Sequence, residues 1–304
     1  MALHTILGTS GPIGKELASL LARHAEEVRQ LSPFQGMAAD TVVDMMNYEQ
    51  LVLAISGSAY VYMLMKPTGA GEWLSIVRNT INACKENRAK LILLDDASFY
   101  RSHPGNLLSE DTVIYAAGMA GRHSLEASAL LQREIAGGFV RAVVARSVDF
   151  YGPGAITDSI PGQLVFARLA AGKRPVLPFN ADVQRSFHYI PDIARALYAL
   201  AITTVSTEMV WHLPAPGEPI TGRKFVALAA EAMNVNKSLI VWPRWRYALA
   251  KRFNKEMAGL RELHSLDTLP MYYDSFRFQR AFQFFPTSYE EGIKASAAWY
   301  HLKR

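Results

Sequence analysis

The sequence predicts an α/β fold: a doubly wound parallel sheet followed by a smaller, mixed C-terminal region. Three observations support this prediction. Apolar, strand-sized runs alternate with helical patterns through the first half of the 304 residues. A glycine-rich turn follows the first of these runs. After residue 154 the pattern becomes irregular, with many prolines and longer loops. Alternating strands and helices indicate right-handed crossovers and a sheet covered on both faces.

The expected elements follow in a regular order along the chain. Strands are expected at 4–10, 28–32, 59–65, 90–96 and 140–148. Helices are expected at 14–26, 47–56, 72–87 and around 121–136. In the first helix, Leu17, Leu20 and Leu21 recur at the spacing that gathers apolar side chains on one helix face. The sequence shows no internal repeat and no low-complexity tract.

Composition and charge exclude several classes of partner. Half of the residues are hydrophobic and 19% are charged, which is ordinary for a globular protein. No apolar run approaches the ~20 residues of a membrane helix. The net charge of +5 is spread thinly, and its densest run is 242–264. A basic segment for nucleic acid or membrane is one interpretation, but a surface helix is favoured because no second basic patch accompanies it. We expect neither a nucleic-acid nor a membrane partner.

The N-terminus and the cysteine content favour a cytoplasmic location. The first residues lack a basic region followed by an apolar stretch and a cleavage site, so we expect no targeting signal. The single cysteine, Cys84, fits a reducing compartment and is expected in the core. The eight histidines form no cluster with metal-ligand spacing, so we expect no metal site.

The turn after the first strand has the pattern of a phosphate cradle. Gly8, Gly11 and Gly14 stand three residues apart between a strand and a helix, and Thr9, Ser10 and Ile13 complete the turn. Glycines at this spacing allow a tight turn in which backbone N–H groups approach a pyrophosphate at the positive end of the helix. A turn that only packs helix on sheet is the alternative. The strand–turn–helix context favours a Rossmann-type dinucleotide site.

The end of the second strand bears on the choice between NAD and NADP. NAD sites usually place an acid there, and NADP sites place an arginine near the 2′-phosphate. Here the position is Ser32, which would not repel a 2′-phosphate. The sequence therefore leans slightly toward NADP. The only nearby cation in that strand is Arg29, and the direction of its side chain is left open.

Several stretches in the same order resemble one family. They are the glycine turn, "VVDMMNYEQL", "KLILLDDASFY", "ARSVDFYGPG", "RSFHYIPDIARALYALA", "VWHLPAPGEPITGRKFVALAAEAM" and "PTSYEEGIKASAAWY". Together they resemble the extended short-chain dehydrogenase/reductase family, the sugar-nucleotide epimerase/dehydratase group and its atypical relatives. The resemblance implies hydride transfer to or from a nicotinamide. It also implies a tyrosine as acid/base, a lysine one helical turn later, and a Ser or Thr that orients the substrate.

This chain departs from that pattern at all three catalytic positions. Counted from Thr112 in "SEDT", the tyrosine position falls on Ala120 and the lysine position on Ser124. Counted back from Tyr100, the Ser/Thr position falls on Asp96. A phenol that titrates near 10 is a poor base at neutral pH without a nearby cation. The resemblance therefore predicts a degenerate catalytic set.

Four residues remain as candidates for acid/base work. They are Asp96, Tyr115, His123 and Ser124. Asp96 follows Asp95 in a strand, so only one of the two carboxylates faces the ligand side. Tyr115 lies five residues before the family position, with Met119 four residues on. A turn cap, a surface or packing histidine and an aromatic plug over the pocket are the alternative roles of Asp96, His123 and Tyr115.

The resemblance also implies contacts with cofactor and substrate. Cofactor contacts are implied at Asp44, Met45, Met63 and Ser147, in addition to Ser32 and the glycine turn. Substrate contacts are implied at Asp149, Tyr151, Arg185 and His188. Alternatively, Tyr151 and Gly152 have a structural role and shape the crossover into the second region. Met63, Met65 and Lys66 replace the small residues that usually follow the fourth strand. The two methionines are expected to narrow the nicotinamide side of the cleft. Lys66 is expected to restore a cation to the pocket.

Two hypotheses of function stay open at this point. The first is an NAD(P)-dependent reductase or epimerase/dehydratase-type enzyme acting on a small carbonyl or hydroxyl substrate with a non-standard acid/base. The second is a redox-inactive relative that performs a cofactor-independent reaction or acts as a nucleotide-binding sensor or partner. We expect an NAD(P)-binding domain over 1–152, completed around 186–213, and a substrate-binding region over 153–185 and 214–304. A homodimer is compatible with either hypothesis.

Overall fold

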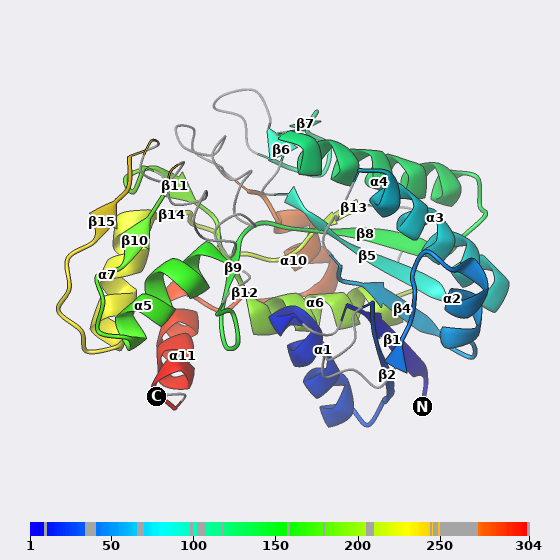
Figure 1. Cartoon of the computed structure of the whole chain (residues 1–304), viewed down its shortest axis with the longest axis horizontal. Helices are drawn as coiled ribbons and strands as arrows, with labels where there is room; N and C mark the ends of the chain where they lie inside the picture. Colours follow the sequence, from blue (N-terminus) through cyan, green and yellow to red (C-terminus); the bar gives the residue numbers. More distant parts are fainter. Residues whose placement is uncertain are drawn as a thin grey trace. The chain divides into compact units, whose positions relative to one another are not determined.

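The computed structural model divides into two compact units (Figure 1). It describes residues 1–8, 11–33, 41–65, 70–97, 100–101, 108–116, 118–156, 159–178, 180–204, 210–243, 245, 249 and 273–302. The first unit comprises Met1–Ala97, Met119–Ser147 and Ile193–Leu213. The second comprises Ser98–Gly118, Val148–Asp192 and Pro214–Arg304. The domain bounds expected from the sequence stay a prediction, and most of the basic run 242–264 lies outside the described residues.

A single parallel sheet forms the centre of the first unit and confirms the predicted fold class. Its strands are β1 (Leu3–Leu7), β2 (Glu27–Ser32), β3 (Thr41–Val42), β4 (Tyr60–Met63), β5 (Lys90–Asp96), β8 (Ala142–Ser147) and β13 (Val210–His212). Their order across the sheet is β13-β8-β5-β4-β1-β2-β3. The order reverses between β1 and β4, and ligands of doubly wound folds bind at such a switch point, beyond the carboxyl ends of the strands.

Helices cover both faces of this sheet (Figure 1). They are α1 (Pro12–Arg23), α2 (Tyr48–Ala54), α3 (Ala70–Asn87), α4 (Gly118–Ala136) and α6 (Ile190–Ile202). Apolar residues of α2, α3 and α4 form one core cluster with inward residues of the strands. Leu51, Val77 and Leu131 are fully buried there, each contributing roughly 2 kcal/mol of hydrophobic stabilisation. None of the described helices combines the length and apolarity needed to cross a bilayer.

The second unit is built from paired short strands and from helices. The antiparallel pairs are β6 (Tyr100–Arg101) with β7 (Tyr115–Ala116), and β11 (Gln184–Arg185) with β14 (Ile220–Thr221). The parallel pairs are β9 (Phe150–Tyr151) with β12 (His188–Tyr189), and β10 (Val176–Leu177) with β15 (Ile240–Val241). The helices are α5 (Ala167–Ala170), α7 (Gly222–Ala232), α10 (Phe276–Phe282) and α11 (Tyr289–Leu302), and a π-helical turn over Pro161–Phe166 leads into α5.

Aromatic side chains fill the core of the second unit. Tyr151, Phe166 and Phe225 are almost completely buried, and the rings of Tyr151 and Phe225 meet edge to face at 5.2 Å. Gly162 lies very close to a neighbouring backbone segment, because a Cβ at this position would be 1.4 Å from the carbonyl oxygen of Ala155. Only glycine fits the π-helical turn at this point.

Candidate functional site

The turn between β1 and α1 holds its first glycine against two neighbouring segments. Gly8 has a φ of +91°, in the left-handed region that favours glycine. Its N–H donates to the carbonyl of Leu31 on β2 at 3.0 Å. A Cβ on Gly8 would lie 2.8 Å from Cγ of Met65, just after β4. Gly8 therefore closes the turn onto β2 and the end of β4. Thr9 and Ser10 lie outside the described residues.

The second glycine begins α1 and leaves space beside the helix end. Gly11 is extended, with φ −75° and ψ 164°, and no side chain caps the helix there. Within the described part of the chain, no heavy atom lies within 4 Å of a Cβ built on Gly11. Ile13 and Gly14 are buried in the first turn, which has no acidic residue. The first amides of α1 and its positive dipole end thus lack a neutralising side chain of their own, as an anion site requires.

The end of β2 does not supply a cation for a 2′-phosphate. Ser32 is fully buried. The guanidinium of Arg29 donates to the carbonyls of Ala54 and Ser56, both at 2.8 Å, and so caps the end of α2. Residues 33–43 contain no lysine or arginine. The cation that would have favoured NADP is therefore engaged elsewhere.

Two side-chain-to-backbone hydrogen bonds lie between β3 and the first turn of α2. The carboxylate of the exposed Asp44 accepts from the N–H of Met46 at 2.9 Å. Asn47 then caps α2 by accepting from the N–H of Gln50 at 3.0 Å. The side chain of Met45 is buried in the core cluster. Of the two residues Asp44 and Met45, both implied to contact the cofactor, only Asp44 presents its side chain to solvent.

Met63 at the end of β4 and Met65 just after it differ in their surroundings. Met63 pairs with Leu7 and Leu93 on the neighbouring strands and is fully buried in the core cluster. Met65 is half-buried and covers Gly8. Met65, rather than Met63, therefore borders the glycine turn. Lys66 lies outside the described residues.

The carboxyl ends of β5 and β8 bring charged and hydroxyl groups together. Arg146 donates from Nε to the carboxylate of Asp95 at 3.3 Å, and both side chains are buried. Asp95 shares its face with the core residues that α4 covers, so its neighbour Asp96 points to the opposite face. Asp96 is half-buried and is the register partner of the buried Ser147. The structure thus places these two candidates side by side at the strand ends.

The buried ion pair has a neighbour that sequence reasoning missed. His212 on β13 is the register partner of Arg146 and is fully buried. Asp95, Arg146 and His212 therefore form a polar row across three strands. Of these three residues, the motif "ARSVDFYGPG" had drawn attention only to Arg146. The position of His212 was not predicted, because β13 and β8 pair across more than 60 residues of sequence.

Helix α4 carries the two positions at which the resemblance predicts the family tyrosine and lysine. It begins at Gly118, so positions 120 and 124 lie one helical turn apart near its start. These positions hold alanine and serine. His123 and Ser124 are both buried, with 8% and 5% exposure. The start of α4 therefore carries a buried imidazole and a buried hydroxyl, and the degenerate catalytic set stays a prediction.

Tyr115 belongs to a different unit from the other three catalytic candidates. It lies in β7, which pairs with β6 in register Arg101↔Tyr115. Its side chain is 49% exposed. Asp96, His123 and Ser124 all belong to the first unit. Neighbourhood along the chain therefore does not make Tyr115 part of the same structural unit as the other candidates.

In the second unit, a buried histidine joins β12 to the segment that leads into β9. His188 is fully buried, and its Nδ1 accepts from the N–H of Val148 at 3.1 Å, so that this nitrogen is unprotonated. The backbone N–H of His188 donates to the carbonyl of Asp149 at 3.0 Å. The ring of Tyr273, which sequence reasoning missed, meets the His188 ring edge to face at 5.0 Å. His188 is therefore held in one orientation.

Two further residues that the resemblance predicts to contact substrate are also buried. Tyr151 is fully buried. Its hydroxyl oxygen packs against Gly292, where an added Cβ would lie only 2.5 Å away. Its side chain is thus a core element of the second unit. Arg185 is 5% exposed and pairs through its backbone with Ile220.

Among the described residues, no three histidine, cysteine, aspartate or glutamate side chains gather as metal ligands would.

The order of the sheet strands and the glycine turn define a doubly wound α/β protein of the dinucleotide-binding class. The family "NAD dependent epimerase/dehydratase" matches residues 4–209. This match covers more than half of the chain, so the chain belongs to the NAD-dependent epimerase/dehydratase family. No curated protein matches it.

Solved structures of several enzymes share the fold. UDP-glucose 4-epimerase from Thermus thermophilus, in complex with NAD, is 17% identical with a TM-score of 0.74, covering 98% of each chain. UDP-N-acetylglucosamine 4-epimerase from Methanobrevibacter ruminantium is 15% identical with a TM-score of 0.78, covering 100% of this chain and 99% of the other. RMD from Pseudomonas aeruginosa, complexed with NADPH, is 16% identical with a TM-score of 0.75, covering 99% and 100%.

Proposed function

We propose that this chain binds a nicotinamide dinucleotide at Gly8, Gly11 and Gly14 and acts on a nucleotide-linked sugar. The observation that supports the binding step is the open space beside Gly11 at the uncapped start of α1. A pyrophosphate there would accept from the first amides of the helix and meet the positive end of its dipole. The bound nicotinamide would supply a hydride donor or acceptor. NAD and NADP both remain candidates, because Arg29 caps α2.

The proposed substrate class rests on the relatives and on the second unit. Two of the similar structures are epimerases of UDP-linked sugars. In this chain the buried guanidinium of Arg185 has the charge and the donors to contact a phosphate. A backbone hydrogen bond joins His188 to Asp149 beside the pair β9–β12, where the resemblance implies contacts with substrate. The assignment of Asp149, Tyr151, Arg185 and His188 to substrate binding stays a proposal.

Asp96 is the group that we propose as acid/base in the degenerate set. The phenol and the ammonium group are missing from positions 120 and 124, and a serine hydroxyl alone is a poor base. Asp96 is half-buried at the carboxyl end of β5, beside Ser147, on the face that the Asp95–Arg146 pair does not use. A carboxylate there is suited to accept a proton from a sugar hydroxyl during hydride transfer.

The binding step is tested by calorimetric titration with NAD⁺, NADH, NADP⁺ and NADPH. Gly11→Val should fold normally, because Gly11 is extended and its Cβ direction is open, but the side chain would occupy the cradle. We expect at least a roughly 100-fold loss of affinity, on the scale of a few kcal/mol for a blocked phosphate site. Gly217→Val, at an exposed glycine whose Cβ direction is also open, is the matched control. A wild-type protein that binds none of the four dinucleotides would refute the proposal.

The acid/base role is tested by turnover with a panel of UDP- and dTDP-linked sugars, followed by chromatographic identification of the sugar product and, for a net oxidation or reduction, at the nicotinamide absorbance band. We expect Asp96→Asn to lower kcat by about 10²–10⁴-fold, the usual range for a lost general base. Tyr115→Phe and His123→Gln serve as parallel variants and should retain most of the activity. If Tyr115→Phe or His123→Gln shows the large loss instead, that residue replaces Asp96 in the assignment.

A second candidate function is a redox-inactive relative that binds a dinucleotide as a sensor or partner, or that performs a cofactor-independent reaction. The observation that favours it is the pair of positions 120 and 124 on α4, which hold alanine and serine. In this case the dinucleotide would bind, and no sugar in the panel would be converted in a reaction that needs the dinucleotide. The same titration and turnover experiments therefore separate the two functions.

A further inference from the structure

The segment over 185–192 carries two of the four residues proposed to contact substrate. Arg185 ends β11, His188 begins β12, and Phe187 lies between the two strands. The N–H of His188 donates to the carbonyl of Asp149, which joins the segment to a third of these residues. The path of the main chain through 185–192 therefore decides how these groups stand relative to one another.

Two residues at the start of α11 hold this segment at two points. The hydroxyl of Tyr289 accepts from the N–H of Phe187 at 3.0 Å. The carboxylate of Asp192 accepts from the N–H and from the hydroxyl of Thr287, at 2.6 and 2.9 Å. The two contacts therefore bracket the stretch from Phe187 to Asp192, which contains β12.

These contacts are shielded from solvent. Phe187, Tyr289 and Asp192 are buried, and Thr287 is half-buried. A backbone N–H or a carboxylate in such surroundings costs free energy when it loses a hydrogen-bond partner, because little water is at hand to replace it. The two bonds to the carboxylate are also charge-assisted, which makes them stronger than bonds between neutral groups. The contacts should therefore stabilise the segment more than hydrogen bonds on the surface would.

The start of α11 is itself well fixed. The hydroxyl of Ser288 accepts from the N–H of Glu291 at 3.2 Å, and the carboxylate of Glu291 accepts from the N–H of Ser288 at 3.3 Å. This reciprocal pair is a capping box, which satisfies two amides of the helix start. In the same turn, Gly292 packs against the hydroxyl oxygen of Tyr151, and the ring of Tyr289 lies 6.3 Å from the ring of Tyr151. The first turn of α11 therefore also contacts β9.

We propose that Thr287 and Tyr289 are positioning residues, which hold the segment 185–192 in the geometry in which Arg185 and His188 bind a nucleoside diphosphate. The inference rests on the proposed function, in which Arg185 and His188 contact a nucleotide-linked sugar. Binding is tighter when the binding groups are in place before the ligand arrives, because less ordering then opposes it. Thr287 and Tyr289 act through the main chain of the segment. All of these residues belong to the second unit.

Hydrogen exchange measured by mass spectrometry tests the restraint. Tyr289→Phe removes only the hydroxyl that accepts from Phe187 and keeps the aromatic ring. Amides of 185–192 should then exchange at least about fivefold faster than in the wild type, because local opening becomes easier. Thr287→Val removes one donor to Asp192 and should act in the same direction. Thr287→Ser keeps the hydroxyl and should retain most of the protection.

The matched control is Tyr300→Phe, which removes a buried hydroxyl from the same helix. This hydroxyl donates to the carbonyl of Ala155 at 2.9 Å. Tyr300→Phe should lower the melting temperature about as much as Tyr289→Phe, but it should leave exchange over 185–192 within about twofold of the wild type. The proposal is overturned if the two variants speed this exchange equally, or if neither does.

Calorimetric titration with UDP separates positioning from a general loss of stability. Tyr289→Phe should weaken UDP binding at least about fivefold and Tyr300→Phe less than about twofold, because only the first releases the main chain between Arg185 and His188. Thr287→Val should also bind UDP more weakly than Thr287→Ser. Equal UDP affinity in Tyr289→Phe and the wild type overturns the proposal, even if stability falls. A wild type that does not bind UDP counts against the proposed substrate class, and the exchange comparison then still decides whether Thr287 and Tyr289 hold the segment.

Discussion

His4 shows how one buried side chain couples the first strand to its surroundings. Its ring is fully buried in β1, with Nδ1 2.8 Å from the hydroxyl of Tyr62 and Nε2 3.9 Å from the carboxylate of Glu26. The ring of Tyr60 lies 4.7 Å away. Burial lowers the pKa of His4, and the nearby Glu26 carboxylate opposes this only partly. The folded protein therefore holds a neutral imidazole at neutral pH.

The first prediction concerns the pH dependence of stability. In the unfolded chain His4 binds a proton near pH 6.5, whereas its folded pKa is lower, so its contribution is complete above pH 6.5 and is lost as the pH falls. Below pH 6.5 the unfolding free energy of the wild type should fall by up to about 1.4 kcal/mol per pH unit more than that of His4→Asn. Urea unfolding at about pH 7.5, 6 and 5 measures this across the titration range of histidine. His301→Asn, at an exposed histidine, should run parallel to the wild type. Parallel curves for His4→Asn would contradict the prediction.

At the same scale, the sequence predicted backbone requirements better than side-chain directions. The glycine spacing predicted a tight turn, and the structure has a positive φ at Gly8 and an open helix start at Gly11. It left open where Arg29 points, because a long side chain on a strand reaches whichever carbonyls the tertiary fold offers. Met63 was expected near the nicotinamide, and the structure buries its side chain in the core instead. The apolar pattern of a strand alone does not predict which residue near its end is the first to leave the core.

Lys90 links the start of β5 to the end of α6. Its ammonium group donates to the carbonyls of Leu200, Ala201 and Thr203 at 2.7, 3.2 and 3.0 Å. These are carbonyls that a helix end leaves without intrahelical partners. Burial, followed by repulsion from Arg141, lowers the pKa of Lys90 to about 8, so the amine is still mostly charged at neutral pH. It therefore also complements the negative end of the helix dipole.

The second prediction tests this helix cap. Lys90→Met keeps the length of the side chain and removes all three donors, so the carbonyls at the end of α6 lose their partners. We expect the unfolding free energy at neutral pH to fall by about 2–4 kcal/mol, as for a buried charged hydrogen-bond donor. Lys85→Met removes a partly exposed lysine that pairs with Glu134 between α3 and α4, and should cost less than about 1 kcal/mol. Similar losses in the two variants, measured by urea unfolding, would rule out a special role for Lys90.

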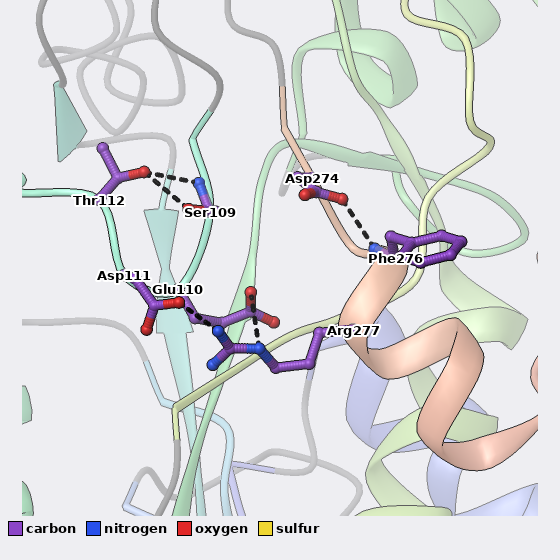
Figure 2. Close-up of polar contacts among 7 residues, drawn as sticks. All are labelled: Ser109, Glu110, Asp111, Thr112, Asp274, Phe276 and Arg277. Carbon is purple, nitrogen blue, oxygen red and sulfur yellow. Dashed lines mark hydrogen bonds and ion pairs between the residues drawn. The ribbon is translucent and has the colours of Figure 1, made fainter.

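Elements with a clear period were predictable, and very short ones were not. The long core strands and the helices α1, α3 and α4 appear where apolar spacing placed them, with ends shifted by a few residues. Two-residue strands such as β3, β6 and β7 are too short to show any alternation. The π-helical turn over Pro161–Phe166 depends on the contact between Gly162 and Ala155, which no local pattern encodes. The hydrogen bond from Arg277 to Asp111 (Figure 2) joins residues 166 positions apart, so no local pattern predicts it either.

At the scale of the whole molecule, the sequence indicated the fold class but not how the chain is shared between units. The candidate acid/base residues Asp96, His123 and Ser124 belong to the first unit, while Tyr115, Asp149 and His188 belong to the second. Proximity in sequence had grouped Tyr115 with His123. The unit boundary runs between them because β7 finds its partner in β6, whereas α4 packs on the large sheet.

The third prediction separates the two units. Gly162→Ala should destabilise the second unit by about 3 kcal/mol, because the added Cβ meets a backbone oxygen that has no room to move. Dinucleotide affinity should change by less than about threefold, because the cradle residues belong to the first unit. Thermal unfolding and calorimetric titration measure the two effects, with Gly217→Ala as the control. A large loss of affinity without loss of stability would show that the cradle depends on the second unit.

The order in which the large sheet is assembled has a consequence for synthesis. The first unit is interrupted by residues 148–192, and its outermost strand, β13, comes only after them. Until residue 212 has been made, the edge of β8 has no strand to pair with, and such edges attract foreign strands. At ribosomal speeds of about 5–20 residues per second, this interval lasts roughly 3 to 13 seconds. The nascent chain therefore passes through an interval in which the unpaired edge of β8 is open to pairing with another polypeptide.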